Sequence, residues 1–293
     1  MIRNLLNILF VIILIAGCQI GEKQTPIVKK VDHILLKVDD VNTQQRLWNF
    51  LADTLKLPIV WPLNDWGTSA SGGLFAGNVV LEIIRYTDDF SKEGDAKLYG
   101  FAFEPYNGTE SCIKELDNRL ISHSKPDSSI WESEDGKKET GWITYGISDV
   151  LTDETRIFVC DYKIDVRPPL IIKASQELRN IRGGPLGLER VKEILVGTTN
   201  VKSEKKRWQN LMAPYSYDEN NGFLLTEGPA IRIVENNDDS LVELLLEVTS
   251  ISQARSFLEK HTLLDKESIN DKLLIQLPDI QGLRLVISGT SAL

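Results

Sequence analysis

His33 and Glu82 are two polar residues placed where their side chains could hold a metal ion. His33 lies in the largely apolar segment Val31–Val38. Glu82 lies in a second apolar segment, Asn78–Ile84, and both segments are typical of β-strands. Side chains alternate between the two faces of a strand, and both residues stand at inward positions of that alternation. Imidazole and carboxylate are ligands for zinc, iron, nickel and manganese, and a carboxylate can also transfer a proton. The pair therefore predicts the start of a metal site, with Glu82 as its catalytic base.

A strand, a helix and three further strands make up the unit that positions this pair, over residues 31–86. Asn42 predicts the start of the helix, because a residue of this type caps the first turn. Short strands at 59–61 and 72–76 then lead to the strand that carries Glu82.

The loop at 62–73 of this unit offers Trp66 and Thr68 as candidate ligand-binding residues. It is small and polar with one aromatic side chain, a composition that is typical of the mouth of a ligand site. A plain hairpin connection explains the same composition, so both interpretations stay open.

Strand, helix and closing strands recur three more times along the chain. The later units span 98–162, 191–234 and 243–287. The polar stretch 122–140 inside the second unit predicts a loop. Proline and glycine bracket residues 167–189, which predicts a connector and a domain boundary. Four βαβββ modules are the simplest interpretation, and they predict an α+β fold.

This order of modules resembles the vicinal oxygen chelate (VOC) superfamily, which holds the glyoxalases, the extradiol dioxygenases and the bleomycin and fosfomycin resistance proteins. The resemblance rests on Asp32-His33-Ile34, Gly67-Thr68 and Leu81-Glu82-Ile83, and it is strongest over residues 31–86. It implies that paired modules curl into two open barrels, with helices outside and a cleft inside. It also implies that metal ligands come from the first and last strands of each module. The expected parts are an N-terminal VOC domain, a connector and a C-terminal VOC domain, over residues 31–166, 167–189 and 190–293.

The other modules hold different residues at the two ligand positions. Those aligned with His33 are Gly100, Glu193 and Glu243. Those aligned with Glu82 are Val159 or Cys160, Arg232 and Arg284. Arginine has no lone pair to give a metal, so we expect no cation in the C-terminal cleft. Its glutamates and arginines are expected to form structural salt bridges, with a site for an anionic group as the alternative.

The N-terminal cleft keeps His33 and Glu82, which Cys160 or Asp161 could supplement. Catalytic metals usually have three protein ligands. We therefore expect at most one divalent transition metal in this cleft, and less than one equivalent of tightly bound metal in the purified protein. Cys112 could form a disulfide with Cys160, or both could be buried thiols.

Residues 1–17 are typical of an export signal that ends at Cys18. The apolar stretch Leu5–Ala16 is too short to span a bilayer. Its Ala-Gly-Cys ending resembles a bacterial lipoprotein signal, which implies cleavage before Cys18, acyl chains such as palmitate on that residue, and a tether over 18–30. Gln19 favours, by the same resemblance, the periplasmic face of a Gram-negative outer membrane, with the cell surface as the alternative. An ordinary secretory peptide or a short membrane anchor would also fit the residues.

The chain is acidic, which limits its partners. It carries 33 Lys and Arg against 42 Asp and Glu, a formal net charge of −9. Because it has no basic tract, phosphate backbones repel it and we expect no nucleic-acid partner. The sequence gives no indication of the oligomeric state.

Three functions fit these observations. The incomplete ligand set favours an envelope-anchored module that binds a small molecule. The alternative is a metal-dependent, glyoxalase-like or dioxygenase-like enzyme, a lyase, isomerase or oxidoreductase that acts on a small periplasmic substrate. The third hypothesis is a cell-envelope protein whose barrels serve only a structural role.

Overall fold

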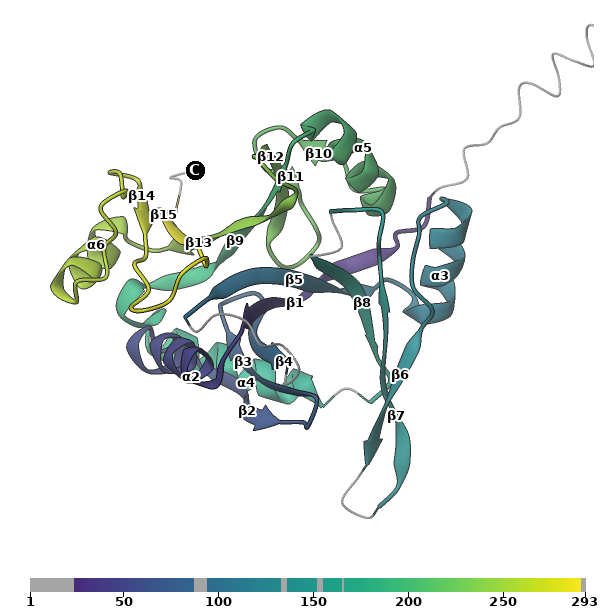
Figure 1. Cartoon of the computed structure of the whole chain (residues 1–293), viewed down its shortest axis with the longest axis horizontal. Coiled ribbons are helices and arrows are strands. Elements are labelled where there is room, and N and C mark those ends of the chain that lie inside the picture. The colour runs from purple at the N-terminus through teal and green to yellow at the C-terminus, as the bar shows by residue number, and fades with distance from the viewer. Residues whose placement is uncertain (1–23, 87–93, 133–135, 152–154, 165, 291–293) are drawn as a thin grey trace, which may run out of the picture.

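The computed structural model describes residues 24–86, 94–132, 136–151, 155–164 and 166–290. The expected signal and Cys18 lie outside the described residues. No helix among the described residues is long and apolar enough to cross a membrane. Two curled sheets with helices packed on them form the molecule (Figure 1). The α+β class is confirmed.

The first module has the expected order of elements. It consists of β1 (Val28–Val38), α2 (Val41–Asn49) with the π-helical turn η1 (Phe50–Thr54), β2 (Ile59–Asp65), β3 (Ser69–Phe75) and β4 (Val80–Tyr86). The strand β1 starts inside the segment expected to be a tether, and Ile27 just before it is only 1% exposed. Asp40, and not Asn42, caps α2, because its carboxylate accepts from the Thr43 backbone N–H at 2.8 Å.

The second module extends the same sheet. It consists of β5 (Ala96–Pro105), α3 (Gly108–Asn118), β6 (Asp127–Glu132), β7 (Lys138–Gly146) and β8 (Arg156–Tyr162). The prediction of a loop over 122–140 is wrong, because β6 pairs with β7 there as an edge hairpin. The eight strands run in the order β2-β3-β4-β1-β5-β8-β7-β6, with β1 parallel to β4 and β5 parallel to β8.

The third and fourth modules form a second sheet of seven strands. They consist of β9 (Leu188–Thr198), α5 (Val201–Met212), β10 (Tyr217–Asp218), β11 (Gly222–Phe223), β12 (Ala230–Glu235), β13 (Ser240–Val248), α6 (Ile251–Lys260), β14 (Lys272–Leu274) and β15 (Leu285–Gly289). The strand order is β10-β11-β12-β9-β13-β15-β14. The fourth module thus shows two strands after its helix among the described residues, one fewer than the others.

The expected connector contains a helix, α4 (Arg167–Asn180), followed by the short 3-10 turn η2 (Gly184–Leu186). Proline is compatible with the first turn of a helix, so Pro168 and Pro169 begin α4 instead of preventing it. Ala174 and Leu178 of α4 are buried with Val80 of β4. Because side chains alternate along β4, Val80 shares a face with Glu82. The helix therefore lies against the face of the sheet that carries Glu82.

One core lies between the two sheets. Ile34 of β1 and Phe101 of β5 are fully buried in it together with Ile194 of β9 and Trp208 of α5. The Phe101 and Trp208 rings stack with centroids 6.1 Å apart. A division into two domains stays a prediction, but the two sheets share buried side chains.

Candidate functional site

We define the inner face as the face of the eight-stranded sheet that points away from the shared core. Leu35, Ile84, Ala102, Phe158 and Cys160 form a separate apolar cluster on it. His33 lies on this face as well, because its ring meets Phe158 edge-on with centroids 5.5 Å apart. The inner face therefore corresponds to the inside of the N-terminal barrel, where the resemblance to the VOC superfamily implies a cleft.

A β-bulge brings Asp32 and His33 together. Two neighbours on a regular strand point to opposite faces, but the pairing of β1 with β5 shifts register between Val31 and His33. Both side chains are buried, and Asp32 Oδ2 lies 2.7 Å from His33 Nδ1. The bulge thus supplies the histidine with a carboxylate partner from the adjacent residue.

Glu82 and Arg167 extend this pair at its two ends. His33 Nε2 lies 3.4 Å from Glu82 Oε2, on the side away from Asp32. The first residue of α4, Arg167, donates to both carboxylate oxygens of Asp32 at 2.7 Å. Its guanidinium also covers the Tyr162 ring, 3.2 Å from the ring centroid. The result is a buried chain of alternating charges, Arg167–Asp32–His33–Glu82.

Within this row of four charged side chains, the pKa shifts of His33 and Asp32 favour their charged forms. Burial by itself lowers the pKa of His33, but the hydrogen bond to Asp32 and the negative charges of Glu82 and Asp32 outweigh it and raise that pKa. Burial by itself raises the pKa of Asp32, but His33 and Arg167 hold it well below its ordinary value. The imidazole is therefore stabilised as a cation between two carboxylates.

The second module places no metal-binding side chain beside the four charged residues. Leu35 pairs with Glu82, and at the matching place Ala102 pairs with Phe158. Phe158 is thus the counterpart of Glu82, and the expected alignment with Val159 or Cys160 is wrong by one or two residues. Gly100 has no side chain that could bind a metal. The position requires glycine, because a Cβ there would lie 1.9 Å from the Arg156 carbonyl oxygen.

Cys160 and Asp161 do not complete a metal site either. Burial raises the pKa of the Cys160 thiol to about 12, so the thiolate that metals bind is disfavoured. Asp161 lies on the other face of β8, where its carboxylate accepts from the Thr109 backbone N–H at 2.7 Å. Cys112 and Cys160 are both free thiols.

The donor set does not fit the metal centre that the resemblance implies. The spacing of His33 Nε2 and Glu82 Oε2 would let both contact one cation, but Phe158 fills the place of a further ligand. The described part of the chain contains no group of three His, Cys, Asp or Glu side chains able to hold a metal ion. Two donors are one fewer than catalytic metals usually have.

The C-terminal sheet carries the expected glutamates and arginines as ion pairs. Arg232 Nε lies 2.6 Å from Glu193 Oε2, with both side chains largely buried. Arg284 Nε lies 3.8 Å from Glu243 Oε2, and 46% of the Arg284 side chain is exposed. Val286, paired with Leu245, is the true counterpart of Arg232, so the alignment of Arg284 was wrong by two residues.

Trp66 and Thr68 lie apart from the charged chain. Both are exposed in the turn between β2 and β3, where the Trp66 N–H donates to the Ser69 carbonyl at 2.7 Å. The structure places neither of them at the inner-face residues described above.

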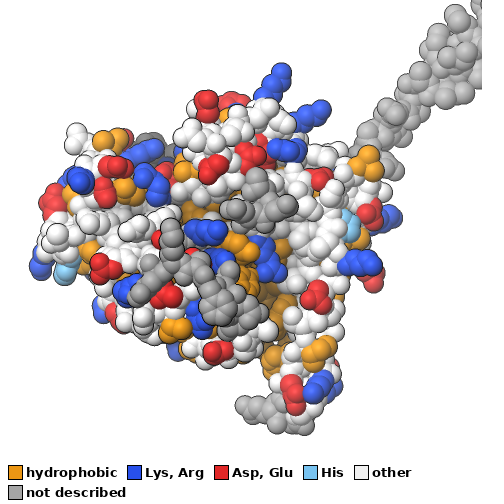
Figure 2. All heavy atoms as spheres, in the orientation of Figure 1, with side chains coloured by type: hydrophobic (Ala, Val, Ile, Leu, Met, Phe, Trp, Pro, Cys, Tyr) orange, Lys and Arg blue, Asp and Glu red, His pale blue; other side chains and the backbone are white. Residues whose placement is uncertain are grey.

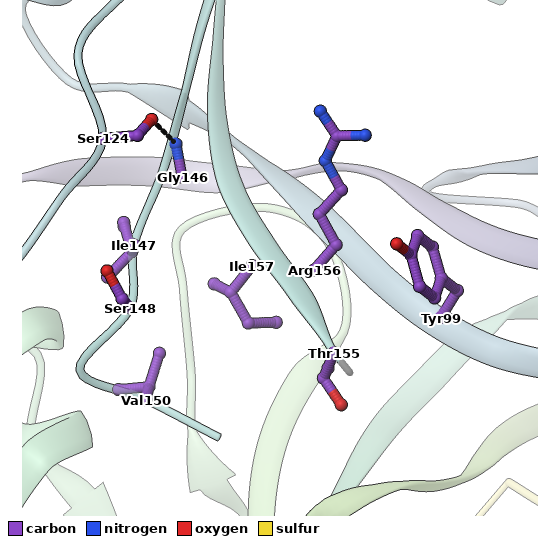
Figure 3. Close-up of a pocket in the computed structure, with 9 residues that line it drawn as sticks. All are labelled: Tyr99, Ser124, Gly146, Ile147, Ser148, Val150, Thr155, Arg156 and Ile157. Atoms are coloured by element: carbon purple, nitrogen blue, oxygen red, sulfur yellow. Dashed lines mark hydrogen bonds between the residues drawn. The ribbon is translucent and has the colours of Figure 1, made fainter. Parts of the chain in front are cut away.

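A pocket of about 320 Å³ opens at one end of β8 (Figure 3). Arg156 and Tyr99 lie beside each other on one side of it. The other lining residues are Ser124, Gly146, Ile147, Ser148, Val150, Thr155 and Ile157. The volume lies at the lower end of the range for small-molecule sites, about 300–1,000 Å³.

Basic side chains gather around the inner face. Figure 2 shows Lys and Arg side chains over hydrophobic ones in the middle of the view, where β1, β5 and β8 run in Figure 1. Lys37 lies 5.2 Å from the Tyr99 ring centroid, and Arg156 donates to the Tyr86 hydroxyl at 2.7 Å. In a chain of net charge −9 this is a local excess of positive charge.

Sequence reasoning missed three members of this site. Asp32 precedes His33, but only the bulge turns it to the same side. Arg167 is remote in sequence and reaches Asp32 because α4 folds back on the sheet. Arg156 opens the apolar strand that contains Phe158, and a basic residue at that position was the available signal.

No family model matches the chain, and no curated protein sequence matches it. Solved structures do. The homoprotocatechuate 2,3-dioxygenase of Arthrobacter globiformis aligns with a TM-score of 0.59 at 12% identity, over 92% of this chain and 82% of the enzyme. An extradiol ring-cleaving dioxygenase of B. fuscum aligns with 0.60 at 12% identity, over 93% and 74%. A hypothetical protein of Staphylococcus aureus aligns with 0.57 at 11% identity, over 89% and 100%. The two half-barrels therefore have the fold of extradiol dioxygenases, one of the groups within the VOC superfamily.

Proposed function

We propose that the N-terminal half-barrel binds a small molecule without a metal ion. The observation that carries this proposal is the chain Arg167–Asp32–His33–Glu82, in which each candidate ligand already has a charged partner. A cation at this place would compete with a proton for His33, because the pKa of this imidazole is raised above its ordinary value. The pocket at the start of β8 gives a ligand room next to this face, because Arg156 lines it from the inner face and Ile157 lines it from the shared core.

A metal-dependent enzyme of the dioxygenase type is the second candidate. One observation favours it, namely that Asp32 holds His33 Nδ1 and leaves Nε2 facing Glu82. Metal-bound histidines commonly have such a carboxylate partner on the other ring nitrogen. Against it stand the Phe158 ring at the place of a further ligand and the Arg167 charge next to Asp32.

Methyl NMR on the full chain, purified in a mild detergent with EDTA, tests the proposal. A set of neutral, cationic and anionic aromatic fragments is added, and methyl signals of Leu35, Ile84 and Ile157 are followed. We expect at least one fragment to shift these signals while those of Leu195 and Leu245, on the second sheet, stay in place. Shifts that occur only after addition of Zn²⁺ or Fe²⁺ would contradict the proposal.

Metal content gives an independent test. We expect less than one equivalent of tightly bound transition metal after incubation with Zn²⁺, Mn²⁺, Ni²⁺ or Fe²⁺ and dialysis. Stoichiometric metal in the wild type that is lost in the His33→Ala, Glu82→Ala double variant would establish the second candidate.

We further propose that the protein is held at the cell envelope by acyl chains on Cys18. The apolar stretch that ends in Ala16-Gly17-Cys18 supports this, and two or more acyl chains anchor a protein stably. Cells that express the protein are fed an alkyne analogue of palmitate. Label on the wild type and none on Cys18→Ser is expected, and equal label on both would contradict the proposal.

A further inference from the structure

Arg156 is the charged side chain among the residues that line the pocket. It is exposed at the start of β8, and its guanidinium donates to the Tyr86 hydroxyl at 2.7 Å. The same group lies over the Phe158 ring, 5.2 Å from the centroid. Its partners within the described ranges are therefore a phenol and an aromatic ring, and no carboxylate there lies within salt-bridge distance of it. This contrasts with Arg232 and Arg284, which each face a glutamate.

The pocket has an apolar floor and a polar rim. Ile147, Val150 and Ile157, which are buried side chains of the shared core, line the pocket. Around the rim stand the hydroxyl groups of Ser124, Ser148, Thr155 and Tyr99. Figure 3 shows Val150 and Ile157 on one side and Arg156 with Tyr99 on the other. Such a cavity accommodates an apolar body together with one polar group.

The aromatic side chains next to Arg156 strengthen its preference for an anion. Tyr86 and Tyr99 meet edge-on with centroids 6.1 Å apart, and Lys37 lies within 6 Å of both ring centroids. A guanidinium held by a phenol and a ring keeps donors for a planar acid group, to which it binds with two parallel hydrogen bonds.

From these observations we infer that the ligand is a small organic anion with an aromatic or otherwise apolar body. Its carboxylate rests on Arg156, and its body lies on Ile157 and Val150 between Tyr99 and the rim hydroxyls. The Phe158 ring separates this acid group from His33, so the buried charged chain stays paired when the ligand binds. This inference rests on the proposed function and names the class of ligand.

Matched pairs of probes test the charge requirement. Benzoate with benzamide, and 2-naphthoate with 2-naphthamide, have nearly the same shape and differ in charge. Titration of the full chain is followed by the methyl signals of Ile157 and Val150 in the presence of EDTA. We expect each carboxylate to bind at least tenfold more tightly than its amide. Inorganic phosphate alone is expected to bind at least tenfold more weakly than 2-naphthoate, because it has no apolar body.

Substitutions of Arg156 test the residue itself. Arg156→Gln should remove the preference for the carboxylate and leave binding of the amide within twofold. Arg156→Lys should restore part of it, because an ammonium keeps the charge without the two parallel hydrogen bonds. Arg85→Gln is the matched control, since it makes the same change of charge on β4, where Arg85 faces Gln44 of α2. It should bind both members of each pair like the wild type.

The outcomes separate the inference from the function on which it rests. If carboxylates and amides bind equally and Arg156→Gln changes neither, the inference is wrong while metal-free binding stands. If phosphate binds as tightly as 2-naphthoate, the inference of an apolar body is wrong. If no fragment of any charge shifts the inner-face or pocket methyl signals, the proposed function itself fails. Unfolding curves of each variant confirm that it is folded.

Discussion

At the residue scale, the site is defined by how buried charges compensate one another. Asp32 and His33 are 8% and 5% exposed, so each needs a partner of opposite charge in the interior. His33 lies between the carboxylates of Asp32 and Glu82, and Asp32 also forms an ion pair with Arg167. The predicted neighbourhood of His33 and Glu82 is present in the structure, but its chemistry depends on residues that strand periodicity does not reveal.

Arg167→Ala is expected to lower the free energy of unfolding by about 3 kcal/mol, because it removes the guanidinium that balances the buried Asp32 carboxylate from the side opposite His33. Urea denaturation followed by tryptophan fluorescence measures the change. Arg179→Ala, at an exposed position near the other end of α4, is the matched control and should change stability by less than about 0.5 kcal/mol. Equal effects of the two substitutions would show that the charged chain is not buried.

At the element scale, close contacts between strands and helices decide which residues are possible. Gly100 allows β5 to approach β8, since a Cβ there would lie 1.9 Å from the Arg156 carbonyl oxygen. Asp161 acts on another element, because it accepts the Thr109 N–H and hydroxyl in the first turn of α3, where Asn107 provides no side-chain cap. Strand β8 therefore contacts β5 closely at Gly100 and caps α3 through Asp161.

Gly100→Ala should destabilise the protein by about 3 kcal/mol or prevent folding, because the backbone of β8 has to move. Gly146→Ala is the control on the neighbouring β7, where the nearest atom to a new Cβ is 3.8 Å away. Thermal unfolding compares the two variants. A stable Gly100→Ala protein with unchanged melting temperature would mean that β5 and β8 are paired differently.

Asp161→Asn tests the cap by its dependence on pH. Burial acts to raise the pKa of Asp161, but Lys163 and the hydrogen bonds from Thr109 lower it below its ordinary value. A lowered folded-state pKa stabilises the protein above the ordinary carboxyl value of about 4, and this contribution is lost as the pH falls through the folded-state value. We expect the variant to be less stable by about 1–2 kcal/mol at neutral pH and the difference to shrink in acid.

Urea curves between neutral pH and the acid range measure this difference. The exposed Asp127 provides the matched control, as Asp127→Asn should differ from the wild type by less than about 0.5 kcal/mol at every pH. A constant deficit of Asp161→Asn at all pH values would argue that packing, and not charge, is responsible.

Capping residues, prolines and the spacing of apolar residues explain which helices and strands could be predicted from the sequence. Ser250 caps α6 by accepting from the Gln253 backbone N–H at 3.2 Å, and a serine directly before an apolar helical period is a pattern that predicts such a cap. The helix α4 was missed because two prolines are typical of a linker as well as of a first turn. The strand β6 and the start of β7 were missed because they bury little, and Ile130 of β6 is 60% exposed.

At the scale of the whole molecule, the two sheets are held by a common core and by buried polar contacts. Glu204 of α5 is fully buried and accepts from the Leu151 N–H at 3.0 Å and from Trp208 Nε1 at 2.9 Å. Asn78 exchanges two hydrogen bonds of 3.0 Å with the backbone of Val191. The repeat of four modules could be predicted from the sequence, but the shared core could not, because it joins side chains that are far apart along the chain.

We expect the two halves to unfold in one cooperative transition. Calorimetry of the full chain should give one peak whose calorimetric and van't Hoff enthalpies agree. Glu204→Ala should shift that single peak to lower temperature, because two buried donors lose their acceptor. Two resolved peaks in the wild type would contradict this and favour halves that fold independently.

The position of α4 limits how this architecture can be divided or recombined. A cut placed before Arg167, where the prolines suggest a border, would separate Asp32 from its cation and uncover Val80. The helix α4 therefore belongs structurally to the N-terminal half. A hybrid protein that exchanges this half for that of another two-barrel protein has to carry the chain through Asn180 to keep the Arg167–Asp32 ion pair and the cover over Val80.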